Sequence, residues 1–471
     1  MSRELTLEEQ QTLQEMMSRA RKAQAVLENY DQEAIDDLCR AVAWEISNKR
    51  TFSRLVILGV EESRMGDPVT RMNKRMKIWG ILRDALRQKS VGIIEEIPEK
   101  GIVKYAKPVG VIASLVPTTN PELTPGGQAV YAIKARDAII FAPHPRAKKT
   151  TWESVEVMRN ALRREGAPED LLQCIPNPSL PLSQALMAAA DLTIATGSLP
   201  MVKAAYSSGK PAYASGAGNA TVIFDETADV KQACLNTMLS KTSDFGSGCS
   251  ADGNLIVHES IYEQVKVELQ AVGGYWANEK ERELLKAVIW DENGKRLPET
   301  VAVSPQQLAK TAGFTVPEDA KFIWVEGDGI GPEYPLCHEK LTTLLSLYKY
   351  EGSFDNAIKM ALAILDVGGK GHSVGIFSYN NDHIHSLAMV APVSRIMVRQ
   401  PQSRSNAGSP TNGMPMTSSL GCGTWGNNIV SENISLKHYM NTTWVSFPIE
   451  RDMPSPEELF GRFYDPKLNE E

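Results

Sequence analysis

A cysteine in a loop of small residues is the position in this chain whose surroundings best suit covalent chemistry. Cys249 follows Gly246, Ser247 and Gly248 and precedes an apolar run, Asn254–Val257. Glycines remove side-chain bulk and let the backbone turn sharply, so a carbonyl carbon could approach the thiol from an open side. Two interpretations are open. Cys249 is either a nucleophile that forms a thioester or a small buried thiol, because free cysteine is among the most buried residue types.

Short apolar runs upstream of this cysteine alternate with helical segments, a pattern typical of an α/β domain with a parallel sheet. The expected strands are Val109–Val116, Ala138–Phe141, Leu192–Ala195 and Ala220–Phe224, and the expected helices lie around residues 125–135, 150–164 and 200–208. Ligands of such sheets bind beyond the carboxyl ends of the strands. The loops at those ends are therefore candidates for a binding site.

The loops after the first three strands carry turn residues and potential anion-binding groups. They are Pro117–Pro121, Ala142–Lys149 and Thr196–Pro200. Ser198 can cap a helix, and a helix N-terminus presents free N–H groups to a phosphate. Routine turn chemistry would use the same residue types. No GxGxxG or Walker-type loop follows any of these strands, which argues against a standard Rossmann or P-loop site and leaves a phosphate-bearing ligand as the favoured interpretation.

The alternation returns after Cys249, and two outlying segments differ from it. Strands are expected at Leu255–Val257, Phe322–Val325, Ser373–Phe377 and Arg395–Val398, with helices at Ile261–Gly273 and Glu279–Val288. Residues 399–428 form a long irregular loop, a feature that is often functional, and Leu420 and Trp425 indicate that it packs. The charged hairpin 92–108 and a strand-like run at Thr443–Ile449 are expected to lie outside the core, facing another subunit.

Length and composition exclude several classes of protein. A chain of 471 residues needs two or more lobes. A net charge of -7 provides no global basic surface for nucleic acid, and no apolar run approaches the roughly 20 residues that span a bilayer. The six cysteines have no CxxC or zinc-type spacing, so we expect reduced thiols, no metal site and a cytoplasmic protein.

Taken together in order, these motifs resemble the CoA-acylating aldehyde dehydrogenases. The resemblance is carried by Pro117–Pro121, His144–Lys149, Thr196–Ser198, Cys249 and Leu420–Asn427, and it covers nearly the whole chain. Within this family, the chain resembles both the aldehyde dehydrogenase half of bifunctional alcohol/aldehyde dehydrogenases and the acylating sulfoacetaldehyde dehydrogenases. The implied fold is α/β, with two parallel-sheet lobes and a small oligomerisation flap. The implied organisation is a cofactor-binding domain at 1–240 interrupted by hairpin 92–108, a catalytic domain at 241–430, and a C-terminal segment at 431–471 that pairs with the hairpin.

The resemblance also implies a mechanism and catalytic residues. Cys249 attacks the aldehyde as a thiolate, and the Asn120 amide with the Cys249 backbone N–H stabilises the oxyanion. Hydride passes to a nicotinamide, and coenzyme A takes the acyl group from the cysteine. His372 assists the thiol or binds CoA, unless it is a structural histidine. Hydrolytic relatives carry a general-base Glu where Ser215–Asn219 stands here, and no carboxylate lies in that segment.

The remaining implied contacts concern the cofactor, the substrate and the assembly. Cofactor contacts are expected from Thr118, His144, Pro145, Arg146, Thr196, Gly197, Ser198, Gly216 and Glu339. A basic cluster of His144, Arg146 and Lys148 could grip a 2′-phosphate, so both NADP and NAD are open. Arg399 and Arg404 could bind an anionic head group such as a sulfonate, or could belong to a solvated loop. The expected assembly is a homodimer or homotetramer.

Three alternatives accompany this interpretation. A hydrolytic aldehyde dehydrogenase would reduce the cofactor equally well without CoA. An acyl-phosphate reductase of similar fold would form an aldehyde from an acyl phosphate. A non-enzymatic scaffold with a decayed site is the third, and the presence of Cys249 and Asn120 counts against it.

Overall fold

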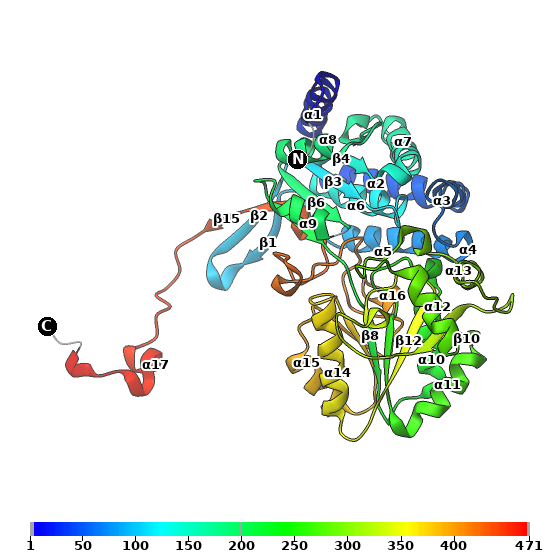
Figure 1. The fold of residues 1–471 in the computed structure, drawn as a ribbon. Helices are drawn as coiled ribbons and strands as arrows, with labels where there is room; N and C mark the ends of the chain where they lie inside the picture. Colours follow the sequence, from blue (N-terminus) through cyan, green and yellow to red (C-terminus); the bar gives the residue numbers. More distant parts are fainter. Residues whose placement is uncertain (1–3, 198, 469–471) are drawn as a thin grey trace.

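The apolar runs of the sequence form buried parallel strands in two separate sheets. The structure is a computed structural model that describes residues 4–197 and 199–468. It has two lobes, each with a parallel sheet covered by helices on both faces, and an antiparallel flap at one side (Figure 1).

The first lobe is built on a five-stranded sheet in the order β5-β4-β3-β6-β7. Its strands are β3 (Val111–Val116), β4 (Ala138–Pro143), β5 (Leu172–Cys174), β6 (Leu192–Thr196) and β7 (Ala212–Ser215). Every residue of β3 and β4 is buried, which explains their unbroken apolar sequence. The helices of this lobe are α1 (Leu7–Leu27), α2 (Gln32–Ser47), α3 (Lys49–Ser63), α4 (Pro68–Arg71), α5 (Arg75–Leu86), α6 (Leu123–Ala135), α7 (Lys148–Arg164), α8 (Leu180–Ala189) and α9 (Leu199–Tyr206).

The second lobe is built on a seven-stranded parallel sheet in the order β10-β11-β12-β9-β8-β13-β14. Its strands are β8 (Thr221–Phe224), β9 (Asn254–His258), β10 (Gly274–Trp276), β11 (Phe322–Glu326), β12 (Leu344–Tyr350), β13 (Val374–Phe377) and β14 (Ile396–Val398). Its helices are α10 (Val230–Lys241), α11 (Tyr262–Ala271), α12 (Glu279–Ile289), α13 (Pro305–Ala312), α14 (Phe354–Val367), α15 (Asn381–Val390) and α16 (Gln402–Ser405). Helices α14 and α15 cover one face, and α10 and α11 cover the other (Figure 1).

The border between the lobes differs from the expected one. The run at 220–224, expected in the first sheet, is β8, and it pairs with β9 and β13 of the second sheet. The second lobe therefore begins after β7, well before residue 241. A buried four-residue run has the same sequence in either sheet, because nothing in it encodes its neighbours.

The first core also recruits the C-terminal part of the chain. Met416, Ile434, Leu436 and Tyr439 are buried in the same apolar cluster as the helices and strands of the first lobe. The expected boundary at residue 430 therefore does not match the core, because residues on both sides of it pack in the first lobe. The chain leaves the first lobe after β7 and returns to it after α16.

The flap has the strand pairing that the sequence predicted. Strands β1 (Ile93–Ile97) and β2 (Ile102–Pro108) form the hairpin, which turns at Gly101 with a left-handed φ of 61°. Strand β15 (Met440–Ser446) pairs antiparallel with β2, from Met440 opposite Pro108 to Ser446 opposite Ile102. The chain then extends away from the body and carries α17 (Pro456–Phe460) (Figure 1).

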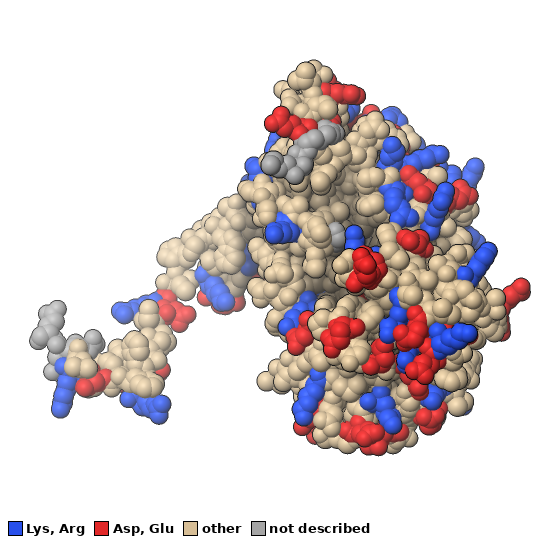
Figure 2. Space-filling view, in the orientation of Figure 1, with Lys and Arg blue, Asp and Glu red and all other residues tan. Residues whose placement is uncertain are grey.

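The charged surface is mixed. On the face in Figure 2, basic and acidic side chains are interspersed over both lobes, with no large region of one sign. Among the described residues, no helix combines the length and apolar character needed to cross a membrane.

Candidate active site

The turn that carries Cys249 is shaped by two non-glycine residues in left-handed backbone conformations. Asp244 (φ 51°) and Phe245 (φ 50°) lie between α10 and β9, directly before the Gly-Ser-Gly run. Such conformations cost about 1–3 kcal/mol each and persist only where surrounding contacts fix them. Asp244 is fully buried, and Ser247 Oγ donates to its Oδ2 at 2.6 Å. The turn is thus held by a buried carboxylate as well as by glycine.

The cysteine precedes β9 and lies beside a histidine that precedes β13, at the same end of the second sheet. His372 Nε2 is 3.1 Å from Cys249 Sγ, and its Nδ1 is 2.9 Å from Ser373 Oγ. Asn406 Nδ2 donates to the same Ser373 hydroxyl at 2.8 Å. Arg395 donates to the His372 carbonyl at 3.0 Å, which fixes the backbone at the amino end of β13. The structure therefore brings together two of the predicted catalytic residues.

Burial keeps both members of this pair neutral. It raises the pKa of Cys249 to about 12, and the negative charge of Glu339 adds to the effect. Burial lowers the pKa of His372 to about 3, with a further contribution from Arg395. At neutral pH a thiol therefore faces an uncharged imidazole. The imidazole can accept the thiol proton on Nε2 if Nδ1 donates its hydrogen to Ser373.

The segment Ser215–Asn219 approaches the cysteine through its backbone. A Cβ added at Gly218 would lie 2.1 Å from the Cys249 carbonyl oxygen and 3.2 Å from His372 Cδ2, so only glycine fits there. Gly218 N–H donates to Glu339 Oε1 at 3.0 Å, and Arg296 contacts Glu339 Oε2 at 3.4 Å. Glu339 is thus engaged by an amide and a guanidinium.

A cavity of about 530 Å³ adjoins this region. It is lined by Gly216 and Gly218, by the carboxylate-bearing Glu339, and by the aromatic residues Trp290 and Trp425. Backbone without side chains, flat rings and a carboxylate suit a nicotinamide and its ribose diol. Of the predicted cofactor residues, Gly216 and Glu339 line this cavity. Trp425 is 49% exposed, so the expectation that it packs the loop is wrong, whereas Leu420 is buried as expected.

The other predicted cofactor residues lie at the carboxyl edge of the first sheet. Parallel pairing of β3 with β4 and β6 brings the loops of Thr118, Pro145 and Thr196 to one edge. Within those loops, several polar groups already have partners. His144 Nδ1 accepts from the Arg146 backbone at 3.2 Å, the Arg146 guanidinium donates to the Ser63 carbonyl at 2.8 Å, and the Thr196 and Ser419 hydroxyls are 2.9 Å apart. Gly197 N–H donates to the Ser215 carbonyl at 3.1 Å, and Ser198 lies outside the described residues.

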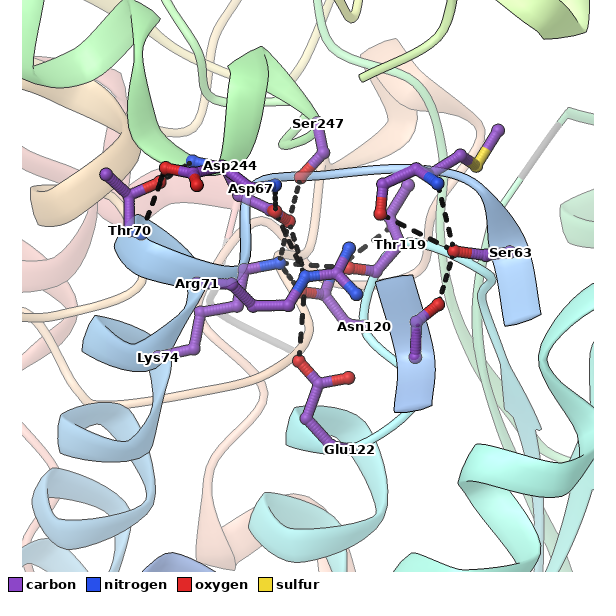
Figure 3. Close-up of polar contacts among 12 residues, drawn as sticks. Ser63, Asp67, Thr70, Arg71, Lys74, Thr119, Asn120, Glu122, Asp244 and Ser247 are labelled. Carbon is purple, nitrogen blue, oxygen red and sulfur yellow. Dashed lines mark hydrogen bonds and ion pairs between the residues drawn. The ribbon is translucent and has the colours of Figure 1, made fainter. Parts of the chain in front are cut away.

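Asn120 is connected to the turn that carries Cys249 by hydrogen bonds through Lys74. Its Oδ1 accepts from Lys74 Nζ at 2.7 Å, and Lys74 also donates to Asp244 Oδ2 at 2.6 Å (Figure 3). The sequence provided no motif for Lys74, because a lysine in a helical segment is usually solvated. Asp244 precedes the Gly-Ser-Gly run of the cysteine loop, but its buried ion pairs with Arg71 and Lys74 have no signal in the sequence.

The predicted substrate arginines lie apart from the cysteine–histidine pair. Arg399 and Arg404 line a different cavity of about 460 Å³ with Gln232 and Asn236, and neither Cys249 nor His372 lines it. Arg399 donates to the Ser378 carbonyl at 2.5 Å and lies 4.6 Å from the centre of the Tyr379 ring.

Sequence reasoning did not single out Lys77. Burial and the charge of Lys74 lower the pKa of Lys77 to about 8. Its Nζ donates to the Ser403 carbonyl at 3.5 Å.

One group within the described part of the chain has metal-ligand spacing. Asp225, Glu226 and His383 offer ligand atoms within 4.8 Å of one another. His383 Nδ1 is 2.8 Å from Asp225 Oδ2, and the imidazole stacks on Phe354 at 4.1 Å. The His383 and Asp225 side chains are thus already paired with each other.

Two parallel-sheet lobes, a flap of antiparallel strands and a cysteine–histidine pair beside a glycine-lined cavity define the aldehyde dehydrogenase class. Residues 3–273 match the aldehyde dehydrogenase family, and the chain belongs to that family.

Relatives that match over most of the chain indicate which members of the family it resembles. The chain is 42% identical over 452 residues to the sulfoacetaldehyde dehydrogenase of an Acholeplasma species, covering 95% of this chain and 93% of that protein. It is 41% identical over 460 residues to the acylating sulfoacetaldehyde dehydrogenase of Bilophila wadsworthia, covering 96% and 98%. The crystal structure of an acetylating aldehyde dehydrogenase from Geobacillus thermoglucosidasius is 36% identical and superposes with a TM-score of 0.91 over 95% of this chain and 99% of that one. The resemblance inferred from the motifs is confirmed.

Proposed function

We propose that this protein oxidises a short anionic aldehyde to its acyl-CoA, with NAD(P)⁺ as hydride acceptor and Cys249 as the nucleophile. The balanced reaction converts aldehyde, CoA thiol and NAD(P)⁺ into thioester, NAD(P)H and a proton. The observation that supports it best is the 3.1 Å contact between Cys249 Sγ and His372 Nε2, with backbone of Gly218 in place of a carboxylate side chain.

The residues of this chain divide the chemistry as follows. His372 Nε2 accepts the thiol proton while its Nδ1–H is held by Ser373, and the sulfur attacks the aldehyde carbon. Asn120 Nδ2 and the Cys249 backbone N–H donate to the oxygen that becomes negative. A nicotinamide bound in the cavity lined by Gly216 and Glu339 would supply the hydride acceptor, and loss of hydride from the former aldehyde carbon leaves an acyl group on Cys249. The CoA thiol then attacks that acyl carbon, and the cysteine sulfur leaves.

The preference for CoA over water follows from the carboxylates around the cysteine. No Asp or Glu lies in Ser215–Asn219, and the Glu339 carboxylate is engaged by Gly218 N–H and Arg296. A water molecule near the acyl-cysteine would lack a free carboxylate as its general base. We expect NAD(P)H formation from an aldehyde to be at least tenfold faster with CoA than without it. Equal initial rates would favour the hydrolytic alternative.

An anionic aldehyde is favoured by the relatives, because two of them are sulfoacetaldehyde dehydrogenases. Arg399 and Arg404 line a separate cavity, which neither Cys249 nor His372 lines. We propose sulfoacetaldehyde as the substrate. A panel of sulfoacetaldehyde, succinate semialdehyde and acetaldehyde, each assayed with NAD⁺ and with NADP⁺, tests this. A higher kcat/KM for acetaldehyde than for both anionic aldehydes would contradict it.

We further propose a homodimer or homotetramer assembled through the flap, inside the cytoplasm. The flap and the arm beyond it expose Trp444 (60%), Phe447 (56%) and Ile449 (50%), an apolar surface typical of an interface. All six cysteines are unpaired, which suits a reducing compartment. Light scattering of Phe447→Ser should show a smaller assembly than the parent protein. Met389→Ser, which alters an exposed methionine of α15, is the matched control, and an unchanged mass for Phe447→Ser would contradict the interface.

A further inference from the structure

We infer that Lys74 is a positioning residue for this reaction: its ammonium orients the Asn120 amide so that Nδ2, and not Oδ1, faces the reacting carbonyl oxygen. The inference rests on the proposed function, in which Asn120 is an oxyanion donor. It adds a residue from a helical segment that carries no recognisable motif.

Lys74 donates its three ammonium hydrogens to three different acceptors. Its Nζ lies 2.7 Å from Asn120 Oδ1, 2.9 Å from the Thr119 carbonyl oxygen and 2.6 Å from Asp244 Oδ2. Figure 3 shows the amine between the loop that follows β3 and the turn that precedes Cys249. Lys74 therefore connects the proposed oxyanion donor to the nucleophile turn.

The chemistry of lysine decides which end of the amide faces it. An ammonium has donors only, so Asn120 must present its oxygen to Lys74 and its NH₂ group to the other side. Within residues 4–197 and 199–468, the Asn120 NH₂ group has only a long contact, 3.4 Å, to Thr119 Oγ1. One strong charge-assisted bond thus fixes the amide while leaving an N–H able to donate to the substrate.

A buried carboxylate holds Lys74 in place. Asp244 accepts from Arg71 Nε at 3.0 Å, from the Asp67 backbone at 2.8 Å and from Ser247 Oγ at 2.6 Å, in addition to Lys74. Although burial acts to raise it, the pKa of Asp244 is lowered by the charges of Lys74 and Arg71. Without Lys74, this carboxylate keeps its three other donors, so the Cys249 turn has a means of surviving the substitution.

A purely structural role for Lys74 would be to neutralise Asp244. The two roles differ in their dependence on Asn120. If Lys74 acts by orienting the amide, its removal has little effect once the amide is gone. If it only supports the fold, its removal lowers activity by the same factor with or without Asn120.

The test is a double-mutant cycle on the full-length protein, measured as NAD(P)H formation with saturating CoA and aldehyde. Removing one oxyanion donor typically lowers kcat by about 10²–10³, which we expect for Asn120→Ala. We expect Lys74→Met to lower kcat by about 10- to 100-fold with KM changed less than about threefold. Lys74→Met in the Asn120→Ala background should lower kcat by no more than about twofold further. Lys280→Met, which alters an exposed lysine of α12, is the matched control for loss of one positive charge.

A second readout separates orientation of the amide from damage to the nucleophile turn. Alkylation of Cys249 by iodoacetamide develops no oxyanion, so Lys74→Met should leave its rate within about twofold of the parent rate. Equal kcat losses in both backgrounds, or a kcat within twofold of the parent for Lys74→Met, would overturn the inference. If Lys74→Met does not fold, Lys74→Gln fills the site with a neutral amide, and the same non-additivity is expected with a loss of about fivefold. An inactive parent protein would instead refute the proposed function.

Discussion

The neutral cysteine–histidine pair predicts slow, strongly pH-dependent alkylation of Cys249 in the protein without ligands. The thiolate is the reactive form, and burial raises the pKa of this thiol from 9.0 to about 12. This difference corresponds to about 4 kcal/mol against ionisation. Because the pKa is raised, the thiol is neutral below about pH 12, and its thiolate fraction grows about tenfold for each pH unit across the working range.

The magnitude can be worked out against a free thiol. At pH 8, a pKa of about 12 leaves about 1 part in 10⁴ as thiolate, whereas a thiol of pKa 9.0 is about 1 part in 10 ionised. A more basic thiolate is intrinsically more nucleophilic, and a Brønsted slope of about 0.4–0.5 returns a factor of about 20–30. We therefore expect Cys249 to react roughly 30- to 60-fold more slowly than the reference thiol at pH 8.

The assay is iodoacetamide alkylation between pH 7 and 10, quenched with acid and quantified on the peptide that contains Cys249. Cys249→Ser identifies the signal, and N-acetylcysteine in the same buffers provides the reference rate. A titration plateau with a midpoint below pH 9, or a rate at pH 8 equal to that of the reference, would refute the reasoning. Either result would mean that burial does not dominate the ionisation of this thiol.

Three further predictions concern the scaffold of the site. Gly218→Ala should lower kcat at least tenfold while the protein stays folded by circular dichroism, because the new Cβ would lie 2.1 Å from the Cys249 carbonyl oxygen; full activity would contradict it. Arg395→Met should lower the free energy of unfolding in urea by about 3 kcal/mol, because buried acceptors lose a charged donor, and a change below 1 kcal/mol would contradict that cause. Asp191, whose pKa is lowered by Arg21 and by the Val111 N–H although burial acts to raise it, should stabilise the fold above pH 3.8. Asp191→Asn should therefore be less stable than the parent at pH 7, with a difference that shrinks as the pH falls below 3.8; a difference independent of pH would contradict this.

The sequence was informative where chemistry and pattern coincide. Cys249 and His372 are 123 positions apart, yet each stands in a short motif, and the structure places their side chains in contact. Part of the flap strand could also be predicted, because the expected run at Thr443–Ile449 overlaps β15, which pairs with the charged hairpin.

The parts that could not be predicted depend on partners that no local pattern encodes. Strand β8 is a four-residue apolar run, and its sheet is decided by the neighbours β9 and β13. Arg399 and Arg404 were selected for their charge, but their direction depends on the backbone around them. The same limit applies to Lys74, because its proposed role depends on three acceptors in two loops that are far apart in the sequence.

The route of the chain between the lobes has a consequence for synthesis. The second lobe is one continuous stretch, whereas the first core needs both the N-terminal helices and residues from Met416 to Tyr439. A growing chain can therefore complete the second lobe while the first still lacks part of its interior. We expect the first lobe to expose apolar surface until Tyr439 has left the ribosome, which makes it the part most dependent on chaperones.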